Sequence, residues 1–347
     1  MGPMPQTTRD TTNDLPTLPH PWRARVPDFK DIEALVALRR LDELQGTGEA
    51  HVDPAGIESE VAGQASWTRR QLVAVGEDDV PRAWITVHDR AAGRALVWGY
   101  FDREVPEIDE IAEAFYRWAE AAAISMARLR GVRRTRLDES PFAGDTRQAR
   151  WLTRAGYERR RTWLHMERPV TPEDAALGPR EGVTVCPVRR HENGMPHAAD
   201  LQIVHEMLER SFEDHFNSNR ESFPEFVQRL REDPGHRWDH WWLAQVETGA
   251  GPTPAGAIVC SVIAAGERGV EGTYVEYIGV DRVARGRGVA KSLLATVIAG
   301  AAERGRDRVA LEVDADSPTK ADELYRSLGW ETDYVTESWF KDIDLPD

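Results

Sequence analysis

The stretch Arg285-Gly286-Arg287-Gly288-Val289-Ala290 follows an apolar run, residues 274–280, and leads into a strongly periodic apolar segment that begins near Val289. The run predicts a strand and the periodic segment predicts a helix, so the stretch itself is a turn between them. Glycines allow a ligand to approach the backbone closely, and the free N–H groups and positive dipole end of a helix N-terminus favour an anion. The sequence therefore predicts that this turn binds a phosphate group.

Two common phosphate loops can be tested against these residues. A Walker A loop requires a glycine directly before Lys-Ser/Thr, whereas Lys291-Ser292 follows Ala290. A dinucleotide-binding fingerprint of the form G-x-G-x-x-G requires its third glycine where Lys291 stands. Both loops are therefore excluded, and a different phosphate-bearing cofactor is expected.

The pattern Arg/Gln-x-x-Gly-x-Gly/Ala is met by Arg285, Gly288 and Ala290. In this respect the chain resembles the GCN5-related N-acetyltransferase (GNAT) family, in which a loop of this form holds the pyrophosphate of acetyl-coenzyme A (acetyl-CoA). The sequence downstream continues in the family's order, with an expected helix at 289–304, an expected strand at 309–313 and a segment, 314–330, that ends in Leu-Tyr-x-x-x-Gly-Trp. The alternative is an ordinary Gly-Arg turn between two unrelated elements.

The composition narrows the classes of partner. The chain has 59 Asp and Glu against 44 Lys and Arg, a formal net charge of −15, which argues against nucleic acid or an anionic membrane. Its two cysteines, Cys186 and Cys260, lie far apart in the sequence, so we expect neither a disulfide framework nor a metal site, and a reducing cytoplasm. We also expect neither a membrane span nor a secretory signal.

A length of 347 residues predicts two domains. A Pro- and Gly-containing linker at 171–182 separates two patterned halves, after a leader at 1–20 that we expect to be disordered. Both halves, 21–170 and 183–347, show the strand and helix order of a mixed α/β (α+β) fold. The resemblance implies two tandem GNAT-like domains, each a mostly antiparallel mixed sheet flanked by helices, in a layout similar to mycothiol synthase and other bacterial members.

The two halves differ where the phosphate turn should lie. In the first half, the corresponding segment 102–110 has no glycine and contains five acidic residues. Carboxylates suit a helix N-terminus but repel a pyrophosphate. We therefore expect the first half to be a degenerate domain without a coenzyme A site, and the second half to be the catalytic domain.

The resemblance also implies how acetyl-CoA is held. The pantetheine arm is expected along Ile278, Gly279 and Val280, where their strand splays from a neighbouring strand at 308–313, and a backbone N–H near Val280 would hydrogen-bond the thioester carbonyl. The Arg285 guanidinium can pair with phosphate, or it is an ordinary exposed arginine. The pyrophosphate is expected on the backbone N–H groups of Arg285, Gly286, Arg287, Gly288, Val289 and Ala290.

Two further residues are expected near the cofactor. Tyr325 stands where many family members place the general acid for the coenzyme A thiolate, and a phenol with a pKa of about 10 can protonate the anion of a thiol with a pKa of about 8.5. The alternative is a tyrosine that closes the core. Ser317 replaces an asparagine of many relatives; it either hydrogen-bonds the cofactor or caps the next helix, with Pro318 as the first helical residue.

The general base is the least specified residue. Glu276 lies on the strand before the turn, and strand alternation puts it on one face with Tyr274 and Ile278. If that face lines the acceptor cleft, a half-buried Glu276 can accept the ammonium proton. The alternatives are a solvated carboxylate and a chain of waters in place of a dedicated base.

The acceptor side carries a weaker signal. Residues 211–223 occupy the region that often covers the acceptor site in the family, and Glu213, Asp214 and His215 within it could bind a cationic or polar acceptor. The cluster formed by Trp238, Trp241 and Trp242 is expected to belong to the core rather than to a binding surface.

The sequence thus predicts an enzyme that moves an acetyl group from acetyl-CoA to the primary amine of a small molecule, by direct attack in a ternary complex and without a metal. One alternative is a mycothiol-synthase-like enzyme that acetylates a cysteinyl amino-sugar conjugate. The other is a sensor that binds acyl-CoA without turnover. The sequence leaves the oligomeric state open.

Overall fold

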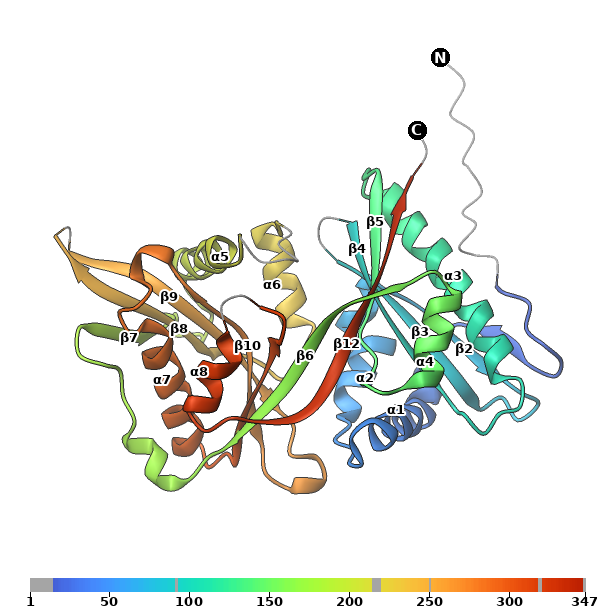
Figure 1. Cartoon of the computed structure of the whole chain (residues 1–347), viewed down its shortest axis with the longest axis horizontal. Helices are drawn as coiled ribbons and strands as arrows, with labels where there is room; N and C mark the ends of the chain where they lie inside the picture. Colours follow the sequence, from blue (N-terminus) through green and yellow to red (C-terminus); the bar gives the residue numbers. More distant parts are fainter. Residues whose placement is uncertain (1–14, 91–92, 214–219, 250, 318–319, 346–347) are drawn as a thin grey trace, which may run out of the picture. The chain divides into compact units, whose positions relative to one another are not determined.

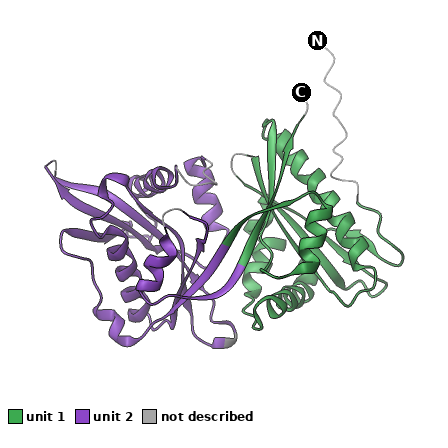
Figure 2. Cartoon of the chain, viewed as in Figure 1, with its two compact units in different colours: residues 1–162, 336–347 green, residues 163–335 purple. Residues whose placement is uncertain are grey.

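The computed structural model describes residues 15–90, 93–213, 220–249, 251–317 and 320–345. The chain divides into two compact units, unit 1 from residues 1–162 and 336–347 and unit 2 from residues 163–335 (Figure 2). Both cuts fall inside strands. The domain boundaries expected from the sequence, 21–170 and 183–347, describe the two sequence repeats and stay a prediction. The boundaries of the two compact units differ from them.

Unit 1 has a sheet in the order β1-β2-β3-β4-β5-β12, in which only β4 and β5 are parallel (Figure 1). Helices α3 and α4 pack on one face of this sheet, and α1 and α2 pack on the other. The elements are β1 (Arg23–Arg25), α1 (Ile32–Thr47), α2 (Pro54–Val61), β2 (Arg69–Val75), β3 (Pro81–Asp89), β4 (Arg94–Phe101), α3 (Ile108–Leu129), β5 (Arg134–Glu139), α4 (Thr146–Arg154) and the last part of β12 (Glu331–Asp344).

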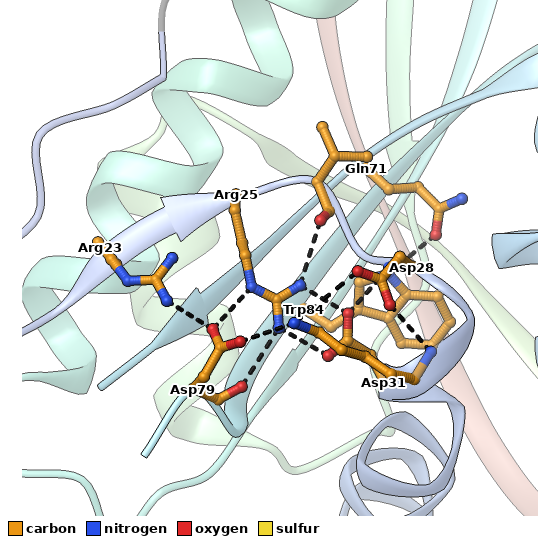
Figure 3. A network of polar contacts seen from close by, with 9 residues as sticks. Arg23, Arg25, Asp28, Asp31, Gln71, Asp79 and Trp84 are labelled. Atoms are coloured by element: carbon orange, nitrogen blue, oxygen red, sulfur yellow. Dashed lines mark hydrogen bonds and ion pairs between the residues drawn. The ribbon is translucent and has the colours of Figure 1, made fainter. Parts of the chain in front are cut away.

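The short strand β1 is fixed in unit 1 by ion pairs as well as by its ladder. The Arg25 guanidinium donates to both oxygens of Asp31, at 2.6 and 2.7 Å, and to Asp79 at 3.0 Å (Figure 3). Arg23 also donates to Asp79, at 2.6 Å. Because Asp79 lies in the turn between β2 and β3, these bonds attach β1 to the neighbouring hairpin.

Unit 2 has a sheet in the order β6-β11-β10-β9-β8-β7, in which only β10 and β11 are parallel. Each unit is thus a mostly antiparallel mixed sheet flanked by helices, as the sequence predicts. The elements are β6 (Glu158–Pro169), β7 (Val183–Pro187), α5 (Ala198–Phe212), α6 (Phe223–Arg231), β8 (His236–Thr248), β9 (Gly251–Ile263), β10 (Gly272–Val280), α7 (Val289–Glu303), β11 (Arg308–Asp314) and α8 (Ala321–Ser327).

Two apolar cores lie on opposite faces of the unit 2 sheet. The α7-side core is formed by α7, α8 and the strands beneath them, and includes Leu293, Val297, Leu311, Tyr325 and Trp330. The α5-side core is formed by α5, α6 and the other sheet face, and includes Leu201, Val204, Phe226, Trp241 and Val259. Which core a side chain of β10 or β11 joins therefore shows the face to which it points.

The final strand of each repeat belongs to the sheet of the other unit. From Trp163 onward, β6 pairs antiparallel with β11, so the first repeat supplies the outer strand of unit 2 next to β11. From Trp339 onward, β12 pairs antiparallel with β5, so the second repeat supplies the corresponding strand of unit 1. The sequence pattern contains both strands but does not indicate this exchange.

Among the described helices, none has the length and apolar character that crossing a bilayer would require.

Candidate functional site

The centre of the unit 2 sheet is split between β10 and β11. The parallel ladder joins Thr273 to Val309, Tyr274 to Ala310 and Val275 to Leu311, and in the described register it ends there. Strand β10 nevertheless continues to Val280, held by antiparallel pairing with β9. The backbone edge of β10 that follows Val275 therefore separates from β11, as the resemblance implies for the strand that holds a pantetheine arm.

A β-bulge lies where this split begins. Val275 pairs with Cys260 and Tyr277 pairs with Val259, so Glu276 is one extra residue in β10. Its carboxylate accepts a hydrogen bond from the Ser261 hydroxyl at 2.7 Å. The bulge places a half-buried carboxylate at the first position beyond the parallel ladder.

The bulge also corrects the prediction that Glu276 shares a face with Ile278. Ile278 packs against the α7-side core, whereas Tyr277 packs against the α5-side core. One extra residue shifts the alternation of the following side chains by one, which a simple period of two does not include. Gly279 meets the α5 side as well, since a Cβ there would come within 2.7 Å of the Ser211 Oγ, and its hydrogen atom lets α5 lie directly on β10.

The turn between β10 and α7 is open at its glycines. Gly286 and Gly288 have φ of 78° and 80°, a backbone conformation that favours glycine. A Cβ added to Gly286 would meet no atom within 4 Å. Gly288 is the N-cap of α7 and provides no capping side chain, so the first N–H groups of α7, from Val289 and Ala290, precede the first intrahelical bond.

A linker residue lies beside this turn. A Cβ on Gly288 would come within 2.8 Å of the Arg180 Cδ, and the Arg180 N–H donates to the Ser292 hydroxyl at 3.0 Å. Arg180, Arg285 and Arg287 are all exposed. The turn is therefore surrounded by three cations, one of which the sequence analysis did not predict because Arg180 lies more than a hundred residues earlier.

Tyr325 and Ser317 lie on either side of the start of α8. Tyr325 is 7% exposed within the α7-side core, and burial raises its pKa to about 12. The N-cap of α8 is Lys320, so the alternative in which Ser317 caps this helix is wrong. The Ser317 N–H instead donates to the Asp314 carbonyl at 3.2 Å, which closes the turn after β11; Pro318 lies outside the described residues.

Comparison with known proteins supports these observations. Residues 201–330 match the Acetyltransferase (GNAT) family. Unit 2 carries a GNAT domain. No curated protein matches the chain.

Solved structures extend the likeness from this domain to nearly the whole chain. A GCN5-related N-acetyltransferase from Sphaerobacter thermophilus is 23% identical, with a TM-score of 0.73 over 95% of this chain and 98% of its own. A tandem GNAT protein from the clavulanic acid biosynthesis pathway is 13% identical, with a TM-score of 0.65 over 94% of this chain and 100% of its own. At these identities the likeness shows the fold, which is a tandem GNAT fold. The family match of residues 201–330 implies acyl-CoA binding by unit 2 and supports acyl transfer there.

Unit 1 differs from the GNAT domain at the segment 102–110. Asp109, in the first turn of α3, accepts hydrogen bonds from Arg147 at 3.0 Å and from the Trp151 indole at 2.8 Å. Arg103 pairs with Asp145 at 2.9 Å. Side chains therefore occupy the region of this helix N-terminus, whereas the corresponding turn in the GNAT domain is open.

The remaining acceptor-side predictions have mixed outcomes. Glu213 is exposed, with its carboxylate 4.0 Å from Arg282, whereas Asp214 and His215 lie outside the described residues. The core assignment of the tryptophans is confirmed, since Trp241 and Trp242 are buried and Trp238 packs against the α5-side core. The described residues contain no group of side chains able to hold a metal ion.

Proposed function

We propose that unit 2 transfers an acetyl group from acetyl-CoA to the primary amine of a small molecule, by direct attack in a ternary complex. The observation that carries this proposal is the separation of β10 from β11 after Val275, directly before the open glycine turn at α7. The first feature suits an extended thioester arm, and the second suits its diphosphate. Two free cysteines, one exposed and one buried, fit a reducing cytoplasm.

The proposal assigns the cofactor contacts to groups around the turn. The N–H groups of Gly286, Gly288, Val289 and Ala290 hold the diphosphate, whereas those of Arg285 and Arg287 donate to the Arg282 and Ala284 carbonyls, each at 3.3 Å. The side chains of Arg180, Arg285 and Arg287 balance the charge of the diphosphate. The pantetheine arm lies along residues 278–280, on the edge of β10 that faces away from β9. Ser317 follows β11, on the other side of the split, and is the polar side chain that would contact the arm from there.

The chemistry requires one new bond, one broken bond and two proton transfers. The amine nitrogen attacks the thioester carbonyl carbon, and the C–S bond breaks to release coenzyme A. Glu276 accepts the proton that the amine loses. Tyr325 donates a proton to the departing thiolate. Its pKa of about 12 keeps the phenol protonated at neutral pH, so that a proton is available when the C–S bond breaks.

The test is release of coenzyme A thiol from acetyl-CoA over a panel of amines, together with calorimetry of acetyl-CoA binding. Tyr325→Phe should lower kcat by a factor of at least ~10² and leave the acetyl-CoA affinity unchanged. Tyr157→Phe, which removes a buried hydroxyl in unit 1, is the matched control. Equal turnover by the Tyr325→Phe variant would remove this residue from the mechanism.

The same assay separates the alternative functions. Tight acetyl-CoA binding without thiol release for any amine would favour a sensor that binds acyl-CoA. Turnover restricted to a cysteinyl amino-sugar conjugate would favour the mycothiol-synthase-like function. An absence of acetyl-CoA binding would contradict all three functions.

A further inference from the structure

The split between β10 and β11 has a carboxylate on each side. Val275 and Leu311 form the last pair of the parallel ladder. The next residue of β10 is Glu276, and the next residue of β11 is Glu312. The two acids therefore occupy corresponding positions where the strands begin to separate.

Glu312 points to the same face of the sheet as the α5-side core. Its neighbours Leu311 and Val313 belong to the α7-side core, and alternation along β11 puts Glu312 on the opposite face. Val259 of β9 belongs to the α5-side core, and alternation along β9 puts Ser261 on the same face. Glu276 accepts a hydrogen bond from the Ser261 hydroxyl, so it lies on this face too.

Tyr274, a half-buried phenol on β10, lies near both acids. Burial raises the pKa of Tyr274 well above its ordinary value, and the negative charges of Glu312 and Glu276 raise it further. Both carboxylates are therefore close enough to act on one side chain. Tyr274 belongs to the last pair but one of the parallel ladder, and the register itself places both acids directly after the last pair.

The position of Glu312 is fixed by a residue of the first repeat. Strand β6 pairs His165 directly with Glu312, and the His165 Nε2 lies 2.9 Å from a carboxylate oxygen of Glu312. The imidazole also stacks on the Tyr334 ring, at 4.1 Å between centroids and 16° between planes. His165 therefore stacks on Tyr334 and at the same time contacts the carboxylate of Glu312.

One arginine on this face, Arg229, is already paired. Arg229 of α6 lies over the Tyr277 ring, 5.2 Å from its centroid. Both oxygens of Glu221 accept from Arg229, at 2.9 and 2.7 Å, which balances its charge. Arg229 therefore does not neutralise Glu312, which keeps 35% of its side chain exposed.

We infer that Glu312 binds a cationic group of the acceptor, that His165 is the positioning residue for Glu312, and that the acceptor is a small diamine. Glu276 is then left to take the proton of the reacting amine while Glu312 holds the second, unreacting ammonium. This inference rests on the proposed function, because it names the substrate class of the same site. It also makes the first repeat a contributor to the acceptor side of the GNAT domain, through β6.

The experiment measures the binding of two probes to the full-length protein saturated with coenzyme A, so that no turnover is needed. The probes are 1,4-diaminobutane and 1-aminobutane, compared by calorimetry. The wild type should bind the diamine about tenfold more tightly, and Glu312→Gln should abolish this preference without changing the affinity for coenzyme A. Glu331→Gln, which removes an exposed carboxylate from β12, should keep the preference.

The positioning role of His165 has its own readout. His165→Leu removes the N–H donor and should weaken diamine binding, whereas His165→Gln retains a donor and should restore most of it. A general loss of structure would weaken coenzyme A binding in both variants. Equal binding of the two probes by the wild type, an unchanged preference in Glu312→Gln, or no binding of either probe would overturn the inference while the proposed function stands. Failure to bind coenzyme A would instead contradict the proposed function.

Discussion

The substitution Glu139→Gln should make the stability of unit 1 less dependent on pH. Glu139 is 2% exposed, and its Oε1 accepts from Tyr116 at 2.8 Å and from Gln148 at 2.7 Å. Its Oε2 finds no partner among the described atoms. Burial raises the pKa of this carboxyl from 4.5 to about 8. Between these values the folded chain therefore holds a proton that the unfolded chain releases.

The sign follows from the raised pKa of the folded state. The stabilisation is fully present below the unfolded pKa, and it is lost as the pH rises toward the folded pKa. Each pH unit inside this window lowers the free energy of unfolding by about 1.4 kcal/mol, so the wild type should lose roughly 2 to 3 kcal/mol between about pH 5.5 and 7.5 relative to the glutamine variant. The amide has the shape of the protonated acid but does not titrate.

The assay is amide hydrogen exchange of α3 peptides in a urea series, because α3 carries Tyr116 and reports on unit 1. The difference between wild type and Glu139→Gln should grow as the pH rises. Glu110→Gln removes an exposed carboxylate from the same helix and controls for the change in net charge. The same difference at both pH values would refute the assignment of a neutral, buried Glu139.

Two further predictions concern the GNAT domain. Gly288→Val should weaken acetyl-CoA binding at least ~10-fold, because the residue has a φ of 80° and a Cβ would come within 2.8 Å of the Arg180 Cδ. Gly305→Val, at a φ of 67° with open space around it, controls for backbone strain. Equal acetyl-CoA affinities of the two variants by calorimetry would contradict this role of the turn. The fragment 183–347 should fail to unfold cooperatively because it lacks β6 and leaves the edge of β11 unpaired, whereas the fragment 158–347 retains this strand. Equally cooperative urea transitions for both fragments would show that β6 is dispensable.

The elements around the turn could be predicted because their signals are local. The sequence predicts a strand over the apolar run 274–280 and a helix at 289–304, and the structure has β10 at Gly272–Val280 and α7 at Val289–Glu303. Alternating or periodic apolar residues and two glycines suffice for this prediction. In contrast, α1 and α2 were not predicted. Few of their residues are buried, among them Leu35, Leu38 and Ile57, so their apolar periodicity is weak.

The features that determine the site's geometry are not local. The bulge at Glu276 depends on how two strands pair, and a single extra residue leaves no mark in the composition of β10. The strand pattern of residues 158–169 is the same whether β6 joins one sheet or the other. For this reason the sequence indicates Tyr325 and Glu276 as candidates, but it gives no signal for His165 or Arg180, which reach the GNAT domain from before residue 183.

The two units show how one architecture can hold a ligand or exclude it. In unit 1 the parallel ladder between β4 and β5 also ends early, after Leu96 and Asp138. There the next residue of β5 is Glu139, whereas the next residue of β11 in unit 2 is Glu312. Glu139 is buried, which raises its pKa to about 8 and favours the uncharged acid. Its hydrogen bonds come from Tyr116 and Gln148, two side chains of the same unit.

Glu312 keeps part of its surface exposed and is held by a histidine from a strand of the first repeat. A carboxylate at the same place in the fold thus closes the split in one unit and is available to a cation in the other. The difference lies in what packs on it: a tyrosine and a glutamine of the same unit for Glu139, and an imidazole with open surface beside it for Glu312. This contrast predicts that charge recognition belongs to unit 2, even though both units contain the acid.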